Sequence, residues 1–277
     1  MINLQNNSGA MVALQTPGGV SSQLDTVQTS MSTGKEVNTA QDNAALWAIS
    51  ELMDSDVSGL RSVLDSLSLG ESTVAVASAR AEQITDILTE MRSLTAISAS
   101  GMEDNRKFEA ALSQKTEQIN SIISSSSFNG LNLLKTDVDG NGGKALTVPS
   151  ALSAAGGLIT LSVDSVDFEG SPQFDIGHRT AITDSASALT ALGEIEGFLA
   201  YAIGSSAALG ASASGIAEQY QFAGKLSDAI TRGVSSMIDT SMEEAAAKLL
   251  ALQAQQQLSS VTLSIGNAMP DTLHNLH

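Results

Sequence analysis

The chain of 277 residues carries 30 Asp and Glu against 13 Lys and Arg, a formal net charge of −17 at pH 7, which disfavours nucleic acid, anionic membrane surfaces and acidic substrates as partners. It has no Cys, which excludes disulfides and thiolate chemistry. Only 3% of the residues are aromatic, so long helical seams of small side chains are favoured over a thick globular core.

A first helix is predicted close to the N-terminus. Apolar residues there recur at spacings of 4, 3 and 4, on one stripe of a helix: Val20, Leu24, Val27 and Met31. Toward the N-terminus Leu4, Met11 and Leu14 continue the rhythm more loosely across an interruption at residues 16–19, which include Pro17. The helix is therefore predicted most clearly from about residue 21 to residue 32. Gly34 is its predicted stop.

Two more helices are predicted after an irregular stretch at residues 35–43. Their apolar positions keep helical spacing, Gly101 separates them, and the second ends before residue 124. Consecutive helices with short connections predict antiparallel neighbours, or one very long helix where a break is weak. The side chains predicted to pack in this bundle are Trp47, Leu60, Leu64, Leu67, Ile84, Ile87, Met91, Phe108 and Leu112.

Residues 136–185 differ in character, because Gly, Asp and Pro become frequent and helical spacing disappears. Apolar and polar residues alternate over residues 159–163, and again over residues 166–168 after Asp164 and Ser165, which predicts a short β-hairpin. An insertion of about 50 residues is too short for much independent stability.

One segment of the insertion resembles a metal site. Four residues match positions 1, 3, 5 and 6 of an EF-hand calcium loop: Asp137, Asp139, Asn141 and Gly142. Position 12 is Val148 instead of Glu and no long helices flank the loop, so a polar turn is favoured. The histidines show no zinc-site spacing and no catalytic motif occurs, so no catalytic, cofactor or metal site is predicted.

Helical spacing resumes after the insertion and continues almost to the C-terminus. Three runs span residues 188–202, 216–237 and 238–265, and Pro270 and the tail at residues 274–277 are the predicted stop of the last helix.

Both ends of the chain are depleted in charge. Residues 1–24 and 249–270 carry no charged side chain, although 16% of the chain is charged. Because charge is costly to bury and a lone amphipathic helix is marginal in water, these ends are expected to pack against each other or against another copy. Neutral solvent-facing helices, an intramolecular coiled coil, and ordering coupled to self-assembly all remain open. The side chains predicted for the coiled coil and subunit interface are Leu24, Val27, Met31, Leu249, Leu252, Leu258, Val261 and Ile265.

Three motifs point to one family. Residues 24–51 read LDTVQTSMSTGKEVNTAQDNAALWAISE, in which a helix end at STGK precedes an N-x-A-x-D-x-A-A pattern whose positions are Asn38, Ala40, Asp42, Ala44 and Ala45. Residues 124–134 read SSSSFNGLNLL, and the closing heptads contain QAQQQL and LSIGNA. Together these motifs resemble bacterial flagellin of the alphaproteobacterial type over roughly residues 1–135 and 186–277.

The resemblance, together with the periodicity, predicts a mainly α fold with an elongated helical bundle, a terminal coiled coil and a small central β insertion. It implies an N-terminal core helix and connecting spoke at residues 1–44 and a C-terminal core helix at residues 237–277. Between them it implies rod-bundle helices at residues 45–135, an outer-surface insertion at residues 136–185 and a return helix at residues 186–236.

The resemblance also implies a function. The chain would be a structural, non-enzymatic subunit that polymerises into the extracellular flagellar filament for swimming. Its implied partners are other copies, the cap and hook–filament junction proteins, an export chaperone and the type III export apparatus, with no nucleic acid and no membrane. Such export would explain the absence of a basic signal-peptide region. The alternatives are a hook–filament junction protein and, from another class, a helical enzyme whose catalytic cluster is not evident.

Overall fold

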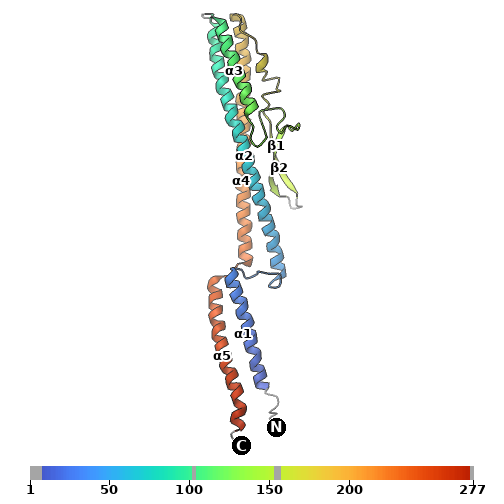
Figure 1. Cartoon of the computed structure of the whole chain (residues 1–277), viewed down its shortest axis with the longest axis vertical. Coiled ribbons are helices and arrows are strands. Elements are labelled where there is room, and N and C mark those ends of the chain that lie inside the picture. The colour runs from blue at the N-terminus through green and yellow to red at the C-terminus, as the bar shows by residue number, and fades with distance from the viewer. Residues whose placement is uncertain (1–7, 102–103, 153–156, 275–277) are drawn as a thin grey trace. The chain divides into compact units, whose positions relative to one another are not determined.

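The computed structural model describes residues 8–101, 104–152 and 157–274, with side chains for residues 15–101, 104–151 and 157–265. Its elements in chain order are α1 (Ser8–Thr33), α2 (Ala44–Ala99), α3 (Asn105–Ser125), β1 (Ala145–Leu152), β2 (Leu158–Asp164), the 3-10 helix η1 (Ile176–His178), α4 (Ser185–Ile238) and α5 (Met242–His274) (Figure 1). The predicted mainly α fold with a terminal helix pair and a small β insertion is therefore confirmed.

The chain divides into two compact units. The terminal unit comprises Met1–Ser55 and Ala229–His277, and the central unit comprises Asp56–Asp228. The long helices α2 and α4 each contribute residues to both units.

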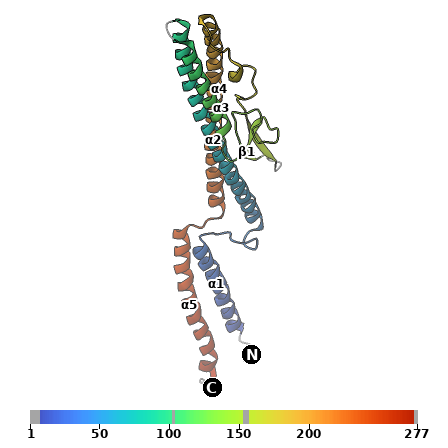
Figure 2. The same cartoon turned by 45° about the horizontal axis from the view of Figure 1, so that its top comes forward.

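The terminal unit is built on α1 and α5, which pack side by side and run antiparallel (Figures 1 and 2). α1 is rich in Ser and Thr, residue types that compete with helical hydrogen bonding. Here the hydroxyl groups of Thr26, Thr29, Ser30 and Thr33 each donate to the carbonyl oxygen four residues earlier, at 2.8 to 3.0 Å. These polar side chains are thereby satisfied within the helix itself.

The predicted interruption of the first helix is wrong. α1 begins at Ser8 and passes through Pro17. α5 also passes through Pro270 and ends at His274, where the tail predicted to stop it begins. Proline permits helical φ and removes only one amide donor, and Thr16 and Gly18 beside Pro17 are exposed. Leu4, Met11 and Leu14, which extend the apolar rhythm, lie outside the described side chains.

The central unit is a bundle of α2, α3 and α4. Arg92 Nε lies 2.9 Å from Glu196 Oε1 across α2 and α4, and Lys115 of α3 pairs with Glu90 of α2. Of the residues predicted to pack here, those that are buried are Leu60, Leu67, Ile84, Ile87, Met91, Phe108 and Leu112, while Leu64 is half-buried.

The return segment forms one helix. By length and composition α4 is apolar enough to resemble a membrane-spanning helix. In this fold, however, part of its apolar surface packs within the bundle, where Ala191, Ile195 and Ala202 are buried.

The insertion contains one antiparallel pair of strands. β1 pairs with β2 from Ala145 opposite Asp164 to Leu152 opposite Leu158, with an irregularity between Pro149 and Ala151. The pair lies close to α2, because a Cβ at Gly70 would come 2.7 Å from Val148 Cγ2. Glycine at position 70 therefore admits this contact.

The predicted pairing of residues 159–163 with residues 166–168 is wrong. Val166 and Phe168 instead donate their backbone N–H groups to the carbonyl oxygens of Leu133 and Leu134, at 2.9 and 2.8 Å. The Phe168 ring is buried, 4.7 Å from the ring centre of Phe174 and edge-on to it. The Phe168 ring also lies 5.5 Å from the ring of Tyr201 on α4, so residues 166–168 anchor the insertion to the bundle by aromatic packing.

A second anchor follows η1. The Arg179 guanidinium binds the carboxylate of Glu109 on α3, and Glu194 on α4 accepts from the backbone N–H of Thr180 at 2.6 Å. These contacts fix the segment before α4 to two helices of the bundle.

Candidate functional site

The predicted function is assembly, so the relevant site is the surface of the terminal unit. This unit contains the helix pair, the two connections between that pair and the long helices, and a groove beside those connections.

The two connections pair with each other. Glu36 N donates to Ile238 O at 2.6 Å, and Thr240 N donates to Gly34 O at 2.9 Å. The chain turns out of α1 at Gly34, whose φ of +73° is a left-handed conformation that favours glycine. The predicted helix stop at Gly34 thus also provides the carbonyl that receives the second connection.

Short-range polar contacts shape the loop that follows. Asp42 Oδ2 accepts from Thr39 N at 2.9 Å and from Asn38 N at 3.1 Å, and these backbone hydrogen bonds lower the pKa of Asp42. Asn43 Oδ1 accepts from Leu46 N at 3.1 Å and caps α2. The N-x-A-x-D-x-A-A pattern therefore specifies a turn and a helix start.

A small apolar cluster lies beneath this loop. Its buried members are Val37, Val234 and Ile238, and Leu46, Trp47, Met53, Ile230 and Met237 pack around them. Trp47 is only partly buried. Its predicted packing role corresponds to this cluster between the start of α2 and the end of α4.

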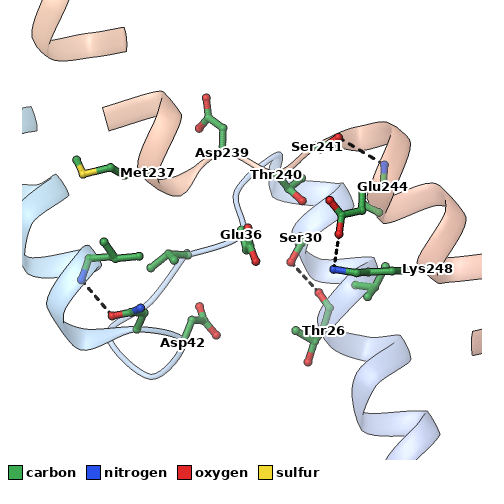
Figure 3. A pocket seen from close by; sticks show the side chains of 15 residues that line it. Thr26, Ser30, Glu36, Asp42, Met237, Asp239, Thr240, Ser241, Glu244 and Lys248 are labelled. Carbon is green, nitrogen blue, oxygen red and sulfur yellow. Dashed lines mark hydrogen bonds and ion pairs between the residues drawn. The ribbon is translucent and has the colours of Figure 1, made fainter. Parts of the chain in front are cut away.

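A groove of about 710 Å³ opens between the end of α1, the loop and the start of α5 (Figure 3). Val27, Leu46 and Met237 supply apolar surface to its lining. Its charged lining residues are Glu36, Asp42, Asp239, Glu244 and Lys248.

One cation moderates the charge of the groove. Lys248 Nζ lies 3.0 Å from Glu244 Oε1, and this hydrogen bond, followed by the charge of Glu244, raises the pKa of Lys248. The charge of Glu36 acts in the same direction. With four carboxylates against one ammonium, the groove is anionic with partly apolar walls.

The residues predicted for the coiled coil fall on two faces of the helix pair. Leu24, Val27 and Met31 are half-buried, and on α5 Leu249 is half-buried and Leu252 is 8% exposed. By contrast, three residues of α5 are exposed in the single chain: Leu258 at 67%, Val261 at 55% and Ile265 at 58%.

Leu250, which is 67% exposed, lies on the same stripe as these three and was not predicted. Its spacing of eight residues from Leu258 is the sequence signal that could have placed Leu250 on this stripe. We call Leu250, Leu258, Val261 and Ile265 the outer stripe of α5.

The calcium-like segment forms a turn. Asp139 Oδ1 accepts from Asn141 N and Gly143 N, both at 2.9 Å, and these bonds lower the pKa of Asp139. Asp137 Oδ1 accepts from Gly140 N at 2.8 Å. Among residues 8–101, 104–152 and 157–274, no group of three or more His, Asp or Glu side chains is arranged to hold a metal ion.

Comparison with known proteins gives consistent matches at both ends of the chain. The family described as "Bacterial flagellin N-terminal helical region" matches residues 4–138, and "Bacterial flagellin C-terminal helical region" matches residues 192–276.

Several curated relatives match over nearly their whole length. Flagellin FljK of Caulobacter vibrioides is 31% identical over 99% of this chain and 98% of its own. A flagellin of Brucella melitensis is 31% identical over 100% of this chain and 99% of its own, and Flagellin C of Rhizobium meliloti is 30% identical over the same shares. Among solved structures, a Bacillus cereus flagellin is 21% identical and covers 68% of this chain and 94% of its own, with a TM-score of 0.39.

Proposed function

Since the chain belongs to the bacterial flagellin family, we propose that its terminal unit forms the filament core, with the outer stripe of α5 covered by neighbouring copies. The chain is a subunit of the extracellular flagellar filament, a structural protein without enzymatic activity, and it assembles with copies of itself.

The outer stripe is the observation that carries this proposal. Its four large apolar side chains are each more than half exposed and follow helical spacing along α5. Full burial of such a side chain is worth roughly 1.5 to 3 kcal/mol, so covering the stripe would contribute several kcal/mol per subunit. α1 packs on the other face of α5, so another copy is the partner that fits.

The chain divides by role along these lines. Residues 1–44 and 237–277 act as the core helices and spoke, residues 45–135 and 186–236 as the rod bundle, and residues 136–185 as the solvent-facing insertion. The loop at residues 34–43 connects α1 to α2.

Other flagellar components complete the set of partners. We infer that the cap and hook–filament junction proteins contact the same terminal helices, and that an export chaperone and the type III apparatus handle the chain before assembly. The full-length likeness to curated flagellins favours a filament subunit over a junction protein, which would not polymerise alone.

Deletion of residues 249–277 tests the proposal. We expect the shortened chain to remain a helical monomer by circular dichroism and to form no filaments by electron microscopy, because it lacks the outer stripe and most of α5. A matched deletion of residues 140–142, which are exposed in the turn of the insertion, should leave polymerisation intact. Normal filaments from the first deletion would contradict the role of the terminal unit.

A further inference from the structure

We propose that the anionic groove of one copy receives the Lys225 region of α4 from another copy. This inference rests on the proposed function, because it assigns one specific contact between subunits that assemble into a filament. The Lys225 region is defined here as Phe222, Lys225 and Leu226.

The groove has the character of a receptor for an amphipathic cation. Glu36 and Glu244 lie on opposite walls of the opening, one from the loop and one from α5 (Figure 3). Asp42 lies on the loop side and is held there by its hydrogen bonds to Thr39 and Asn38. Glu244 is already paired with Lys248, so an incoming cation would mainly offset the charges of Glu36 and Asp42.

The groove also offers apolar surface. Val27 and Met237 are half-buried, so apolar parts of an incoming side chain can pack on them. A binding surface that combines apolar walls with an anionic rim selects a partner with both features.

The Lys225 region has this combination. Phe222 is 56% exposed and Leu226 is 38% exposed. Lys225 and Leu226 follow Phe222 by three and four residues, so all three lie on one side of α4. Lys225 is exposed and has no ion-pair partner within 4 Å among the described residues. The exposed position of Phe222 is unusual for a phenylalanine in a chain that has only six.

Two other exposed cations, Arg106 and Lys144, fit the groove less well. Arg106 lies 4.0 Å from Asp104 and precedes a buried Phe108, so it lacks an exposed large apolar neighbour on that side. Lys144 is followed by the buried Leu146. Charge complementarity together with exposed apolar area therefore favours the Lys225 region.

Charge reversal tests the pairing. We expect Glu36→Lys and Lys225→Glu each to raise the critical concentration for polymerisation about tenfold, the equivalent of 1.4 kcal/mol. The double variant Glu36→Lys with Lys225→Glu should recover most of that loss, because the opposite charges face each other again. The matched controls Glu51→Lys and Lys107→Glu reverse exposed charges outside both surfaces and should change the critical concentration less than twofold.

Cross-linking identifies the contact as one between copies. The chain has no Cys, so the double variant Glu36→Cys with Lys225→Cys carries the only two thiols. After polymerisation and treatment with a short bis-maleimide, we expect a ladder of covalent dimers and longer oligomers on a denaturing gel. Either single-Cys variant should give no ladder beyond a dimer.

The outcomes separate this inference from the proposed function. Normal filaments that give only monomers after cross-linking, together with single charge reversals that polymerise normally, would overturn the inference and leave the filament role standing. Failure of the unmodified chain to polymerise at all would overturn the proposed function instead. Circular dichroism of each variant monomer checks that its helices are retained.

Discussion

The Arg179 guanidinium forms two hydrogen bonds to the Glu109 carboxylate, Nη2 to Oε1 at 2.8 Å and Nη1 to Oε2 at 3.0 Å. The Arg179 side chain is only 6% exposed, and Glu109 also accepts from Ile182 N at 2.8 Å. This one contact ties the segment that leaves the insertion to α3.

Replacement of Arg179 by Met should lower the free energy of unfolding of the central unit by about 2 kcal/mol, because Glu109 is left partly buried without its cation. Urea unfolding followed by circular dichroism measures this loss. The control Arg92→Met removes an exposed pair with Glu196 and should cost below about 1 kcal/mol. Equal effects from both variants would contradict the special role of Arg179.

The Glu109 pair should also make stability depend on pH. Burial alone would raise the pKa of Glu109, but the hydrogen bonds from Arg179 and Ile182 outweigh it and lower the pKa below its ordinary value. A carboxyl whose pKa is lowered in the folded state contributes stability above its unfolded pKa and loses that contribution as the pH falls through the folded pKa.

The stability difference between the native chain and Glu109→Gln should therefore be largest near pH 7 and shrink steadily below about pH 4. Urea unfolding of both proteins across this range gives the difference directly. A difference that stays constant down to pH 2 would show that ionisation of Glu109 is not the cause.

Pro17 weakens α1 at an accessible position. Proline in a helix interior is about 3 kcal/mol less favourable than alanine, so Pro17→Ala should slow amide hydrogen exchange in residues 18–30 by up to about a hundredfold. Hydrogen-exchange mass spectrometry of the monomer measures this. Gln15→Ala, at an exposed site of similar helix propensity, should leave the exchange rates almost unchanged.

Gly34 is required for its backbone conformation and not for space. A Cβ at this position would meet no atom within 4 Å, but the φ of +73° costs other residues about 1 to 2 kcal/mol. Gly34→Ala should therefore destabilise the terminal unit by about that amount, while Gly34→Asn, which tolerates this conformation better, should cost less. Thermal unfolding of the two variants compares them, and an equal loss would contradict the explanation.

The two faces of α5 should respond differently to substitution. Leu258→Ser with Val261→Ser removes exposed apolar surface, so the monomer should keep its stability and lose polymerisation. Leu252→Ser removes a side chain that is 8% exposed and should lower the stability of the helix pair by about 2 kcal/mol as well. Thermal melts and filament yield, measured in parallel, distinguish the faces.

Periodicity predicted the helices well where one stripe of each is buried. In α3 the two residues predicted to pack, Phe108 and Leu112, are buried, and Ile119 and Ile122 continue the same helical spacing and are buried too. The strand β1 was not predicted, because Pro149 lies in its middle and prolines are rare inside sheets. Phe168 was predicted as a strand residue from its sequence neighbours. Its packing partners, the rings of Phe174 and Tyr201, come next to it only in the folded chain.

The sequence alone could not predict which apolar face of α5 packs against α1 and which is exposed, and the reason is geometric. Leu249 and Leu252 keep heptad phase with Ser259, which is buried, whereas the step from Leu252 to Leu258 is six residues and moves onto an adjacent face. Both stripes are apolar, so hydrophobicity does not reveal which one meets α1. The groove was unpredictable for a related reason, because its walls come from residues near opposite ends of the chain.

The pairing of α1 with α5 has a kinetic consequence. Thr33 ends α1 and Met242 begins α5, so any contact between the two helices closes a loop that contains most of the chain. Loop-closure entropy makes such contacts slow to form, whereas the helices of the central unit gain local contacts early. Under the proposed function, a chain that has lost either helix cannot join a filament, so assembly would also select for whole subunits.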